Sequence, residues 1–115
     1  LIVNISSRGG REYVHSASYG VGKAGVDRMV QDFAIELEPF GVCALSLSPS
    51  KVKTEFILDM VAAGKMTLDP AVAQSVRLSG RAIAALASDG SLAEKNGQIL
   101  TVSEVQREYG LIDPG

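Results

Sequence analysis

Residues 42–48 read Val-Cys-Ala-Leu-Ser-Leu-Ser, a short run of apolar and small side chains that is followed at once by Pro49. A run of this length between breaking residues predicts a buried β-strand. Proline ends the strand because it has no N–H group to donate to a neighbouring strand. The patterns on either side of this run determine how the strand is connected.

The segment before this strand predicts a first strand and a long amphipathic helix. Leu1–Ile5 is short and rich in β-branched residues, and small polar residues followed by Gly9-Gly10 end it. From Ser18 to about Glu38, apolar residues recur every three or four positions, with charged and amide side chains between them. Ser16 or Ser18 can cap the start of this helix.

The segment after the strand predicts two helices and a third strand. We expect a short helix near Glu55–Ala63 and a longer one from about Pro70 to Ser88. The buried stripe of the longer helix would consist of Val72, Val76, Ile83 and Leu86. Gln98–Val102 follows an Asn-Gly turn and has the pattern of a strand.

Length and composition agree with a globular α/β protein. The chain has 115 residues, of which 46% are hydrophobic and 21% charged, which suits at most one domain with a packed core. Strands that alternate with helices long enough for crossovers predict a parallel sheet covered on both faces. The order of elements is that of half a doubly wound fold, in a single partial domain over residues 1–115.

Charge and cysteine content exclude several classes of function. The net charge is −2 and there is no basic run, so nucleic acid is not an expected partner. Cys43 has no disulfide partner, and His15 alone cannot complete a zinc site with it, which favours a reducing, intracellular and cytoplasmic setting. Leu1 begins inside an apolar run without signal-peptide features, and no apolar stretch has membrane length. We therefore expect a soluble chain that is truncated at its amino terminus.

Polar side chains are expected to meet where the strands end. Ligands of doubly wound sheets bind beyond the carboxyl ends of the strands, which brings Ser6, Ser7 and the loop Pro49–Thr54 to one rim. Tyr19 and Lys23 are four residues apart on the long helix and share a face. An ammonium group near a phenol favours proton exchange at neutral pH, as a carbonyl/alcohol reaction needs, and Ser7 can reach the same oxygen. A Tyr–Lys pair by itself is more often an ordinary surface contact.

The combination of these motifs resembles the short-chain dehydrogenase/reductase family. The matching elements are the strand Ile2–Ser7, the Tyr19-x-x-x-Lys23 pair, the segment Leu45–Pro49 and the tail Val52-x-Thr54. With the ending Arg107–Leu111, which also matches, they extend over almost the whole chain. The resemblance implies the carboxyl-terminal half of a doubly wound, parallel-sheet Rossmann-type domain that binds NAD(P)H, with NADPH slightly favoured.

The resemblance also implies roles for individual residues. Tyr19 would be the catalytic acid/base, Lys23 would favour its ionised form and hold the ribose hydroxyls, and Ser7 would polarise the substrate oxygen. The cofactor-binding residues would be Tyr19, Lys23, Pro49, Ser50, Val52 and Thr54. The reaction would be hydride transfer between the nucleotide and a small carbonyl or alcohol substrate. Subunits of the complete protein would pair through the long helix, whose stripe includes Met29 and Phe33.

Three features depart from the family pattern. Ser7 precedes Tyr19 by 12 residues, one fewer than the commonest spacing, so Ser6 at 13 remains a second candidate for the serine role. Ser50 stands where a glycine usually follows the proline. No Gly-rich phosphate turn is present, and we expect these 115 residues alone not to form a competent enzyme.

Other interpretations of the same residues remain open. Gly20–Lys23 is similar to the end of a phosphate-binding loop, but Ala24 replaces the required Ser or Thr. Ser7 and His15 could serve a hydrolase, yet no Gly-x-Ser-x-Gly elbow exists, and His15 would otherwise touch substrate or solvent. Cys43 is expected to be a small buried hydrophobe.

An apolar cluster and the long helix allow two further interpretations. An apolar substrate lid or ordinary packing could account for Phe56, Ile57, Met60 and Met66. The chain could also be a non-catalytic fragment or interaction module that retains the half-fold, since the stripe of the long helix could pack against a partner.

Overall fold

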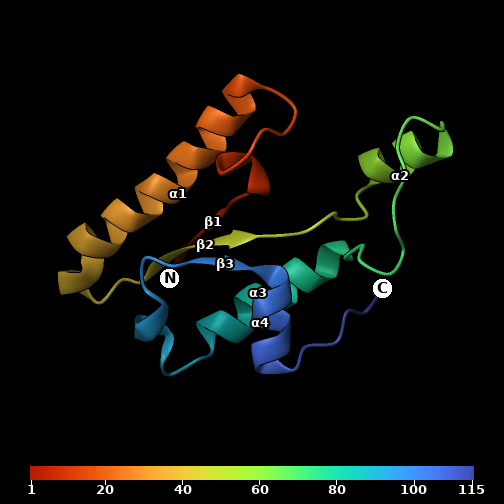
Figure 1. The fold of residues 1–115 in the computed structure, drawn as a ribbon. Coiled ribbons are helices and arrows are strands. Elements are labelled where there is room, and N and C mark those ends of the chain that lie inside the picture. The colour runs from red at the N-terminus through yellow and green to blue at the C-terminus, as the bar shows by residue number, and fades with distance from the viewer.

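Three parallel strands form the centre of the computed structural model, which describes all residues from Leu1 to Gly115 (Figure 1). The strands are β1 (Ile2–Ile5), β2 (Ala44–Ser48) and β3 (Ile99–Thr101), and they lie in the order β1-β2-β3. The register pairs Asn4 with Ser46, and Ser46 with Ile99. The predicted parallel α/β sheet is therefore confirmed, with the buried strand β2 at its centre.

Helices cover both faces of this sheet, as Figure 1 shows. α1 (Ala17–Leu37) lies on one face, and α3 (Val76–Ala87) and α4 (Val102–Tyr109) lie on the other. α2 (Glu55–Ala62) lies beyond the carboxyl end of β2, away from both layers. None of the helices combines the length and the apolar character needed to cross a membrane.

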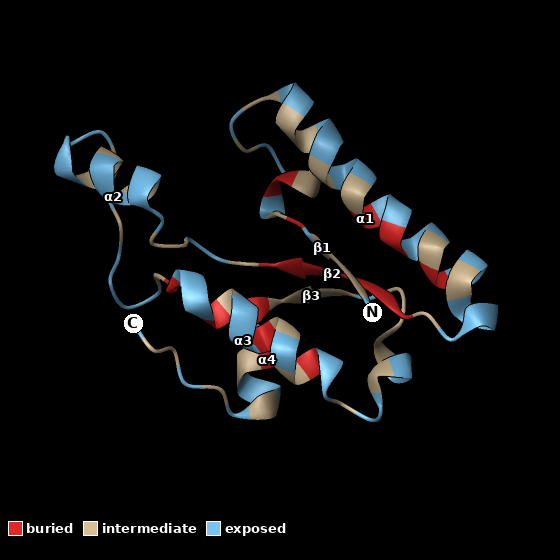
Figure 2. Cartoon of the chain, turned by 180° about the vertical axis from the view of Figure 1, so that it is seen from behind, coloured by how far each residue is buried: buried red, intermediate tan, exposed pale blue.

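The apolar core lies between the sheet and the pair α3 and α4. Successive side chains of a strand point to opposite faces, and the odd-numbered residues of β2 point to this side. The buried cluster consists of Cys43, Leu45, Leu47, Leu78, Ala82, Leu86, Val102 and Val105. In Figure 2 the buried colour follows β2 and the inward faces of the helices. This layer supplies most of the hydrophobic stabilisation of the chain.

The opposite face of the sheet, which α1 covers, is more polar. By the same alternation, Asn4, Ser6 and Ser46 point to this side, where α1 buries Val30 and Asp27. The Asn4 amide nitrogen, the two serine hydroxyls and one carboxylate oxygen of Asp27 are buried without a hydrogen-bond partner. This face therefore holds hydrogen-bonding capacity that the chain itself does not satisfy.

The start of α1 follows the serine-cap prediction. The hydroxyl oxygen of Ser16 accepts the N–H of Tyr19 at 3.1 Å, so Ser16 is the cap and Ser18 lies inside the first turn. At the other end, a short 3₁₀ turn at Glu38–Phe40 leads to Gly41, whose φ of 72° reverses the chain. Gly41 suits this position because glycine adopts positive φ without a side-chain clash.

The expected start of the longer helix was wrong. The helix begins at Val76 and not near Pro70, because Ser75 caps it and Gln74 forms a parallel β-bridge with Val52. Val72 and Val76, expected in the buried stripe, are therefore exposed. The side chains of α3 that are buried are Leu78, Ala82 and Leu86.

The helix α4 was missed in the sequence pattern. Thr101 and Glu104 form a capping box, in which Thr101 accepts the Glu104 N–H at 3.1 Å and Glu104 accepts the Thr101 N–H at 2.7 Å. Hydrogen bonds from Thr101 hold the pKa of Glu104 below its ordinary value. The helix starts directly at Val102, which had been assigned to the preceding strand. With only Val102 and Val105 buried, α4 has too few apolar residues for a clear periodic signal.

Candidate functional site

The carboxyl ends of β1 and β2 open onto a cavity of about 500 Å³. Four of the predicted site residues line it: Ser7, Tyr19, Pro49 and Ser50. Lys23, Val52 and Thr54 do not line it. The cavity therefore brings together segments of the chain that are about forty residues apart in the sequence, at the rim that the sheet topology favours.

Ser7 and Ser6 have different environments. Ser7 lines the cavity, and its hydroxyl oxygen accepts the N–H of Gly9 at 3.1 Å, which caps the 3₁₀ turn Arg8–Gly10. Because that oxygen acts as the acceptor, its hydrogen stays free to be donated. Ser6 is only 3% exposed and does not line the cavity. Of the two serines, Ser7 is the one that a ligand in the cavity can reach.

Two glycines allow Tyr19 to pack closely on the end of β1. A Cβ atom at Gly9 would lie 2.5 Å from a ring carbon of Tyr19, and one at Gly10 would lie 3.1 Å from the main chain of Lys23. Any side chain at Gly9 would therefore displace the ring. From the sequence, these glycines were interpreted only as the end of the first strand. Their position directly after Ser6-Ser7 was the available signal for a close approach.

Lys23 lies behind Tyr19 and is attached to the first strand. Its Nζ donates a hydrogen bond to the main-chain oxygen of Ile5 at 3.1 Å and lies 6.0 Å from the centre of the Tyr19 ring. The two side chains share one side of α1, as their spacing predicts. The ammonium group is thus held near the aromatic ring by the sheet itself.

His15 contacts Tyr19 from the loop before α1. The two ring centres are 5.0 Å apart and nearly perpendicular, and His15 lines the cavity. The φ of His15 is 65°, in the left-handed region that side chains other than glycine seldom adopt. The Tyr13 phenol donates to the His15 carbonyl at 3.3 Å. The sequence interpretation that His15 touches a substrate remains a prediction.

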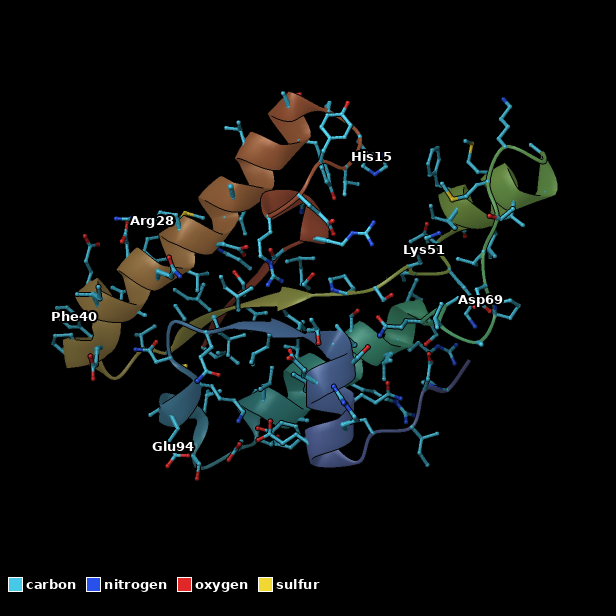
Figure 3. All side chains as sticks on the ribbon, in the orientation of Figure 1. His15, Arg28, Phe40, Lys51, Asp69 and Glu94 are labelled. Carbon is cyan, nitrogen blue, oxygen red and sulfur yellow. The ribbon has the colours of Figure 1, made fainter.

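The far wall of the cavity is mostly apolar. Its apolar residues are Ile57, Met66 and Val72, and Val14 adds an apolar side chain beside His15. Of the cluster considered as a lid, Ile57 and Met66 line the cavity, whereas Phe56 is exposed and Met60 lies outside the lining. Figure 3 shows His15 on the α1 side and Lys51 and Asp69 on the loops that flank α2. All three of these polar residues also line the cavity.

The loop after β2 has unused backbone donors, among them the N–H of Val52. Gln74 donates its N–H to Lys51 O at 2.9 Å and accepts the Lys53 N–H at 2.9 Å. Successive peptide groups point to opposite edges of an extended chain, so Val52 presents its own N–H and C=O away from Gln74. The Val52 carbonyl accepts the Thr54 N–H, and the Val52 N–H has no partner. A carboxamide needs one donor and one acceptor, and the free N–H and remaining lone pair of Val52 fit such a group.

Thr54, which the family resemblance assigns to cofactor binding, caps a helix in the structure. Its hydroxyl accepts the N–H of Ile57 at 3.2 Å and caps α2. The Ser50 N–H is also engaged, because it donates to the side-chain oxygen of Gln74 at 3.0 Å. These two residues therefore shape the loop, whereas the Val52 N–H is free for a ligand.

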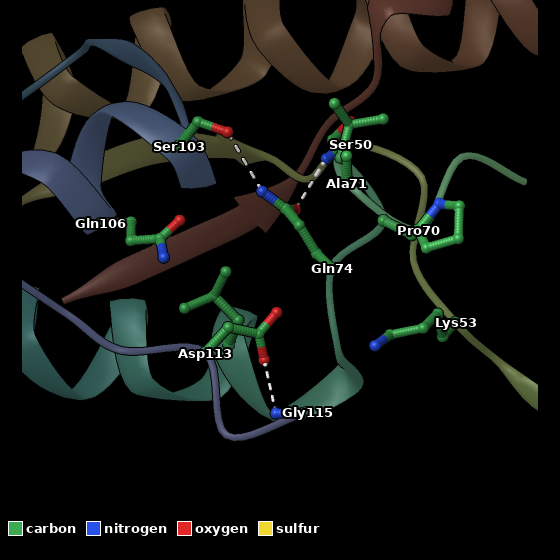
Figure 4. Close-up of a pocket in the computed structure, with 12 residues that line it drawn as sticks. Ser50, Lys53, Pro70, Ala71, Gln74, Ser103, Gln106, Asp113 and Gly115 are labelled. Atoms are coloured by element: carbon green, nitrogen blue, oxygen red, sulfur yellow. Dashed lines mark hydrogen bonds between the residues drawn. The ribbon is translucent and has the colours of Figure 1, made fainter.

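A second cavity, of about 590 Å³, shares Ser50 and Val72 with the first (Figure 4). Gln74, Ser103 and Asp113 contribute to its wall. The Asp113 carboxylate accepts the Ser75 N–H at 2.8 Å and so ties the carboxyl-terminal tail to the start of α3. Hydrogen bonds from Ser75 also hold the pKa of Asp113 below its ordinary value.

Cys43 has the environment of a buried hydrophobe. It is 8% exposed, belongs to the apolar core and donates weakly to the Leu92 carbonyl at 3.5 Å. Burial raises the pKa of its thiol above the ordinary value. Both features disfavour a reactive thiolate, as expected from the sequence.

Comparison with solved structures agrees with the fold. ElxO with NADP bound superimposes with a TM-score of 0.73 over 88% of this chain and 44% of ElxO, at 22% identity. An ElxO variant with NADPH bound gives a TM-score of 0.74 at 21% identity. A 3-oxoacyl-[acyl-carrier protein] reductase from Brucella melitensis with bound NAD gives 0.68 at 22% identity, over 88% of this chain and 38% of the reductase. At these identities the likeness shows the Rossmann-type fold alone.

Comparison with sequences is more specific. Dehydrogenase/reductase SDR family member 1 is 37% identical in its Homo sapiens form and 38% in its Mus musculus form, over 122 aligned residues. Each alignment covers 98% of this chain, which spans 39% of the length of these relatives. The sequence profile described as short chain dehydrogenase matches residues 1–65, more than half of the chain. The chain belongs to the short-chain dehydrogenase family.

Proposed function

We propose that this chain forms the catalytic rim of an NAD(P)-dependent oxidoreductase, which transfers a hydride between a nicotinamide nucleotide and a carbonyl or alcohol carbon. One observation carries the proposal: Ser7 and Tyr19 line the same cavity, and Lys23 is anchored directly beside Tyr19. The bound nucleotide supplies or accepts the hydride. The residues of this chain position the reactants and move the proton.

Tyr19 moves the proton at its phenol oxygen. In carbonyl reduction Tyr19 donates the proton to the substrate oxygen, and in alcohol oxidation it accepts the proton back. Lys23 supports this exchange by holding its ammonium group near the Tyr19 ring. Ser7 donates its free hydroxyl hydrogen to the same substrate oxygen, which holds the carbonyl group beside Tyr19.

The nucleotide would be held by groups from both sides of the rim. The Lys23 ammonium has three N–H donors and uses one on the main chain, so two remain for the ribose hydroxyls. The N–H and C=O of Val52 suit the carboxamide of the nicotinamide ring. Pro49 and Ser50 form the adjoining wall, and Thr54 acts by capping α2.

The substrate would be a small carbonyl or alcohol compound with an apolar substituent. Ile57, Met66 and Val72 present an apolar wall in the cavity that also contains Ser7 and Tyr19. Burying an apolar substituent against this wall would orient the reactive carbon toward the phenol. The nucleotide would be NADPH or NADH, since solved structures of this fold hold NADP, NADPH or NAD, and the family resemblance slightly favours NADPH.

Titration of the complete gene product with NADPH and NADH tests this proposal. The expected result is saturable binding of at least one nucleotide, together with nucleotide oxidation when apolar aldehydes or ketones are added. Failure of both nucleotides to bind at millimolar concentration would contradict the proposal. It would also favour the alternative function, a non-catalytic interaction module.

We also propose that copies of the protein associate through α1 inside a reducing compartment. Val21 and Ile35 are each 74% exposed and Met29 is 41% exposed, so α1 carries apolar surface that its own core does not cover (Figure 2). Phe33, which was expected in the same stripe, is half-buried.

The unpaired thiol of Cys43 is compatible with an intracellular, cytoplasmic setting.

A further inference from the structure

Gln74 is a buried polar residue that the proposed reaction does not use. It is 5% exposed, and glutamine is seldom buried to this extent unless its amide group is hydrogen-bonded. Figure 4 shows its side chain between Ser50 and Ser103. Its Oε1 accepts the Ser50 N–H at 3.0 Å, and its Nε2 donates to the Ser103 hydroxyl at 3.1 Å.

The main chain of Gln74 contacts the same loop. Its N–H donates to Lys51 O and its carbonyl accepts the Lys53 N–H, both at 2.9 Å. Every hydrogen bond between residues 49–53 and a segment beyond Thr54 therefore ends on Gln74. Gln74 is therefore the one hydrogen-bonding anchor that this loop has beyond Thr54.

We propose that Gln74 is a positioning residue that holds the loop 49–53 in the conformation that binds the nucleotide and links this loop to α4. Its backbone bridge turns the Val52 N–H and C=O away from Gln74, where the N–H and the second lone pair of the carbonyl are free for the carboxamide. Its side chain fixes Ser50 at one end and Ser103, in the first turn of α4, at the other. This inference rests on the proposed nucleotide site and adds a positioning function to it.

The amide side chain is the chemical group that this position requires. One end must accept from the Ser50 N–H and the other must hydrogen-bond the Ser103 hydroxyl, and a glutamine does both without carrying charge. A glutamate in the ionised form would accept from the Ser50 N–H and could accept from the Ser103 hydroxyl, but its charge would be costly to bury. A leucine of similar size would leave the Ser50 N–H without its partner.

Four single variants of the complete gene product test this assignment. Gln74→Leu removes both side-chain hydrogen bonds, Gln74→Glu keeps the acceptor, and Ser103→Ala removes only the contact with α4. The matched control is Gln106→Leu. Gln106 lines the same cavity, and its side chain makes no hydrogen bond.

The measurements are amide hydrogen exchange at Ser50 and Lys53, the Kd of NADPH or NADH, and kcat at saturating nucleotide. We expect Gln74→Leu to speed Ser50 exchange and to weaken nucleotide binding about tenfold or more, as loss of a buried hydrogen bond implies. The value of kcat should fall less than the affinity. Gln74→Glu should restore part of the affinity, Ser103→Ala should show a smaller loss, and Gln106→Leu should match the parent protein.

The outcomes separate this inference from the proposed function. Faster Ser50 exchange in Gln74→Leu with an unchanged Kd would overturn the positioning role while leaving the nucleotide site intact. Equal losses in Gln74→Leu and Gln106→Leu would also overturn it. Absence of nucleotide binding in the parent protein would overturn the proposed function first and this inference with it. If Gln74→Leu does not fold, Ser103→Ala must still show faster loop exchange and weaker binding.

Discussion

The Nζ atom of Lys23 donates a hydrogen bond to the main-chain oxygen of Ile5 at 3.1 Å, which ties the second turn of α1 to the last residue of β1. This contact fixes the ammonium group near Tyr19, at 6.0 Å from the ring centre. The fold therefore holds the lysine side chain in this position even without a ligand. Its remaining donors are free for the nucleotide in the proposed reaction.

Removal of the Tyr19 hydroxyl should stop the chemistry without disturbing the binding site. We expect Tyr19→Phe in the complete gene product to lower kcat by at least about a hundredfold, because it removes the proposed acid/base group. Nucleotide affinity, measured by titration, should stay nearly unchanged. Lys23→Ala should weaken nucleotide binding as well as turnover. A Tyr19→Phe turnover within threefold of the parent would refute the acid/base role.

A methyl group at Gly9 should disturb the site through Tyr19. The added Cβ would lie 2.5 Å and 2.8 Å from two ring carbons of Tyr19, so the ring must move. We expect Gly9→Ala to lower kcat about tenfold to a hundredfold, because such displacements misalign reacting groups. Gly80→Ala in α3, with nothing within 4 Å, is the control and should stabilise the helix by about 1 kcal/mol. Equal activity of the two variants would contradict the packing argument.

Stability at high pH should depend on Tyr109. Burial and a hydrogen bond to Asp89 raise the pKa of Tyr109 to about 12, above the value near 10 of an unfolded tyrosine. The folded chain therefore keeps a proton that the unfolded chain loses, and stability should fall as the pH rises from about 10 to 12. Tyr109→Phe should flatten this decline in denaturant titrations, because no proton remains to be lost there.

The Asp89 end of the same contact predicts an effect at low pH. The hydrogen bond from Tyr109 lowers the pKa of Asp89 in the folded chain. The ionised carboxylate therefore stabilises the folded chain above the unfolded-state pKa near 4, and this stabilisation is lost as the pH falls through the lower folded-state pKa. Tyr109→Phe should weaken this acid-side dependence. Asp89→Asn should end the alkaline decline at a lower pH, because it removes a contact that raises the folded-state pKa of Tyr109. Profiles that coincide with the parent at both ends would be inconsistent with the contact.

Self-association should depend on the apolar surface of α1. We expect the complete protein to be at least dimeric in light scattering at micromolar concentration. Met29→Asp should weaken association at least about tenfold, since a charge would be buried in the interface. Ala84→Asp, at an exposed position of α3 on the other side of the sheet, should have little effect. A monomeric parent protein would argue against pairing through this surface.

Local patterns in the sequence were sufficient for most of the layered fold. The apolar runs at β1 and β2 and the long stripe of α1 lie within a few residues of their predicted bounds. Hydrophobic periodicity is a local property, and the residues that determine it are covalently close. The four-residue spacing of Tyr19 and Lys23 likewise required only helical geometry to bring them to one face.

Tertiary contacts determined what these local patterns could not. Residues 70–74 have helical character in the sequence, but they form a turn followed by the bridge between Gln74 and Val52, and α3 begins only at Val76. The different environments of Ser6 and Ser7 and the need for Gly9 depend on where the Tyr19 ring lies.

The sequence by itself therefore determined the fold class and the chemical groups at the rim, because periodicity and helical spacing act over a few residues. Only the tertiary structure decided how those groups meet. The loop 49–53 takes its conformation from hydrogen bonds to Gln74, about twenty residues away along the chain. Such hydrogen bonds join segments that are far apart in the sequence, and no periodic pattern of residues predicts which segments will meet. The geometry of these bonds is therefore defined only after the chain has folded.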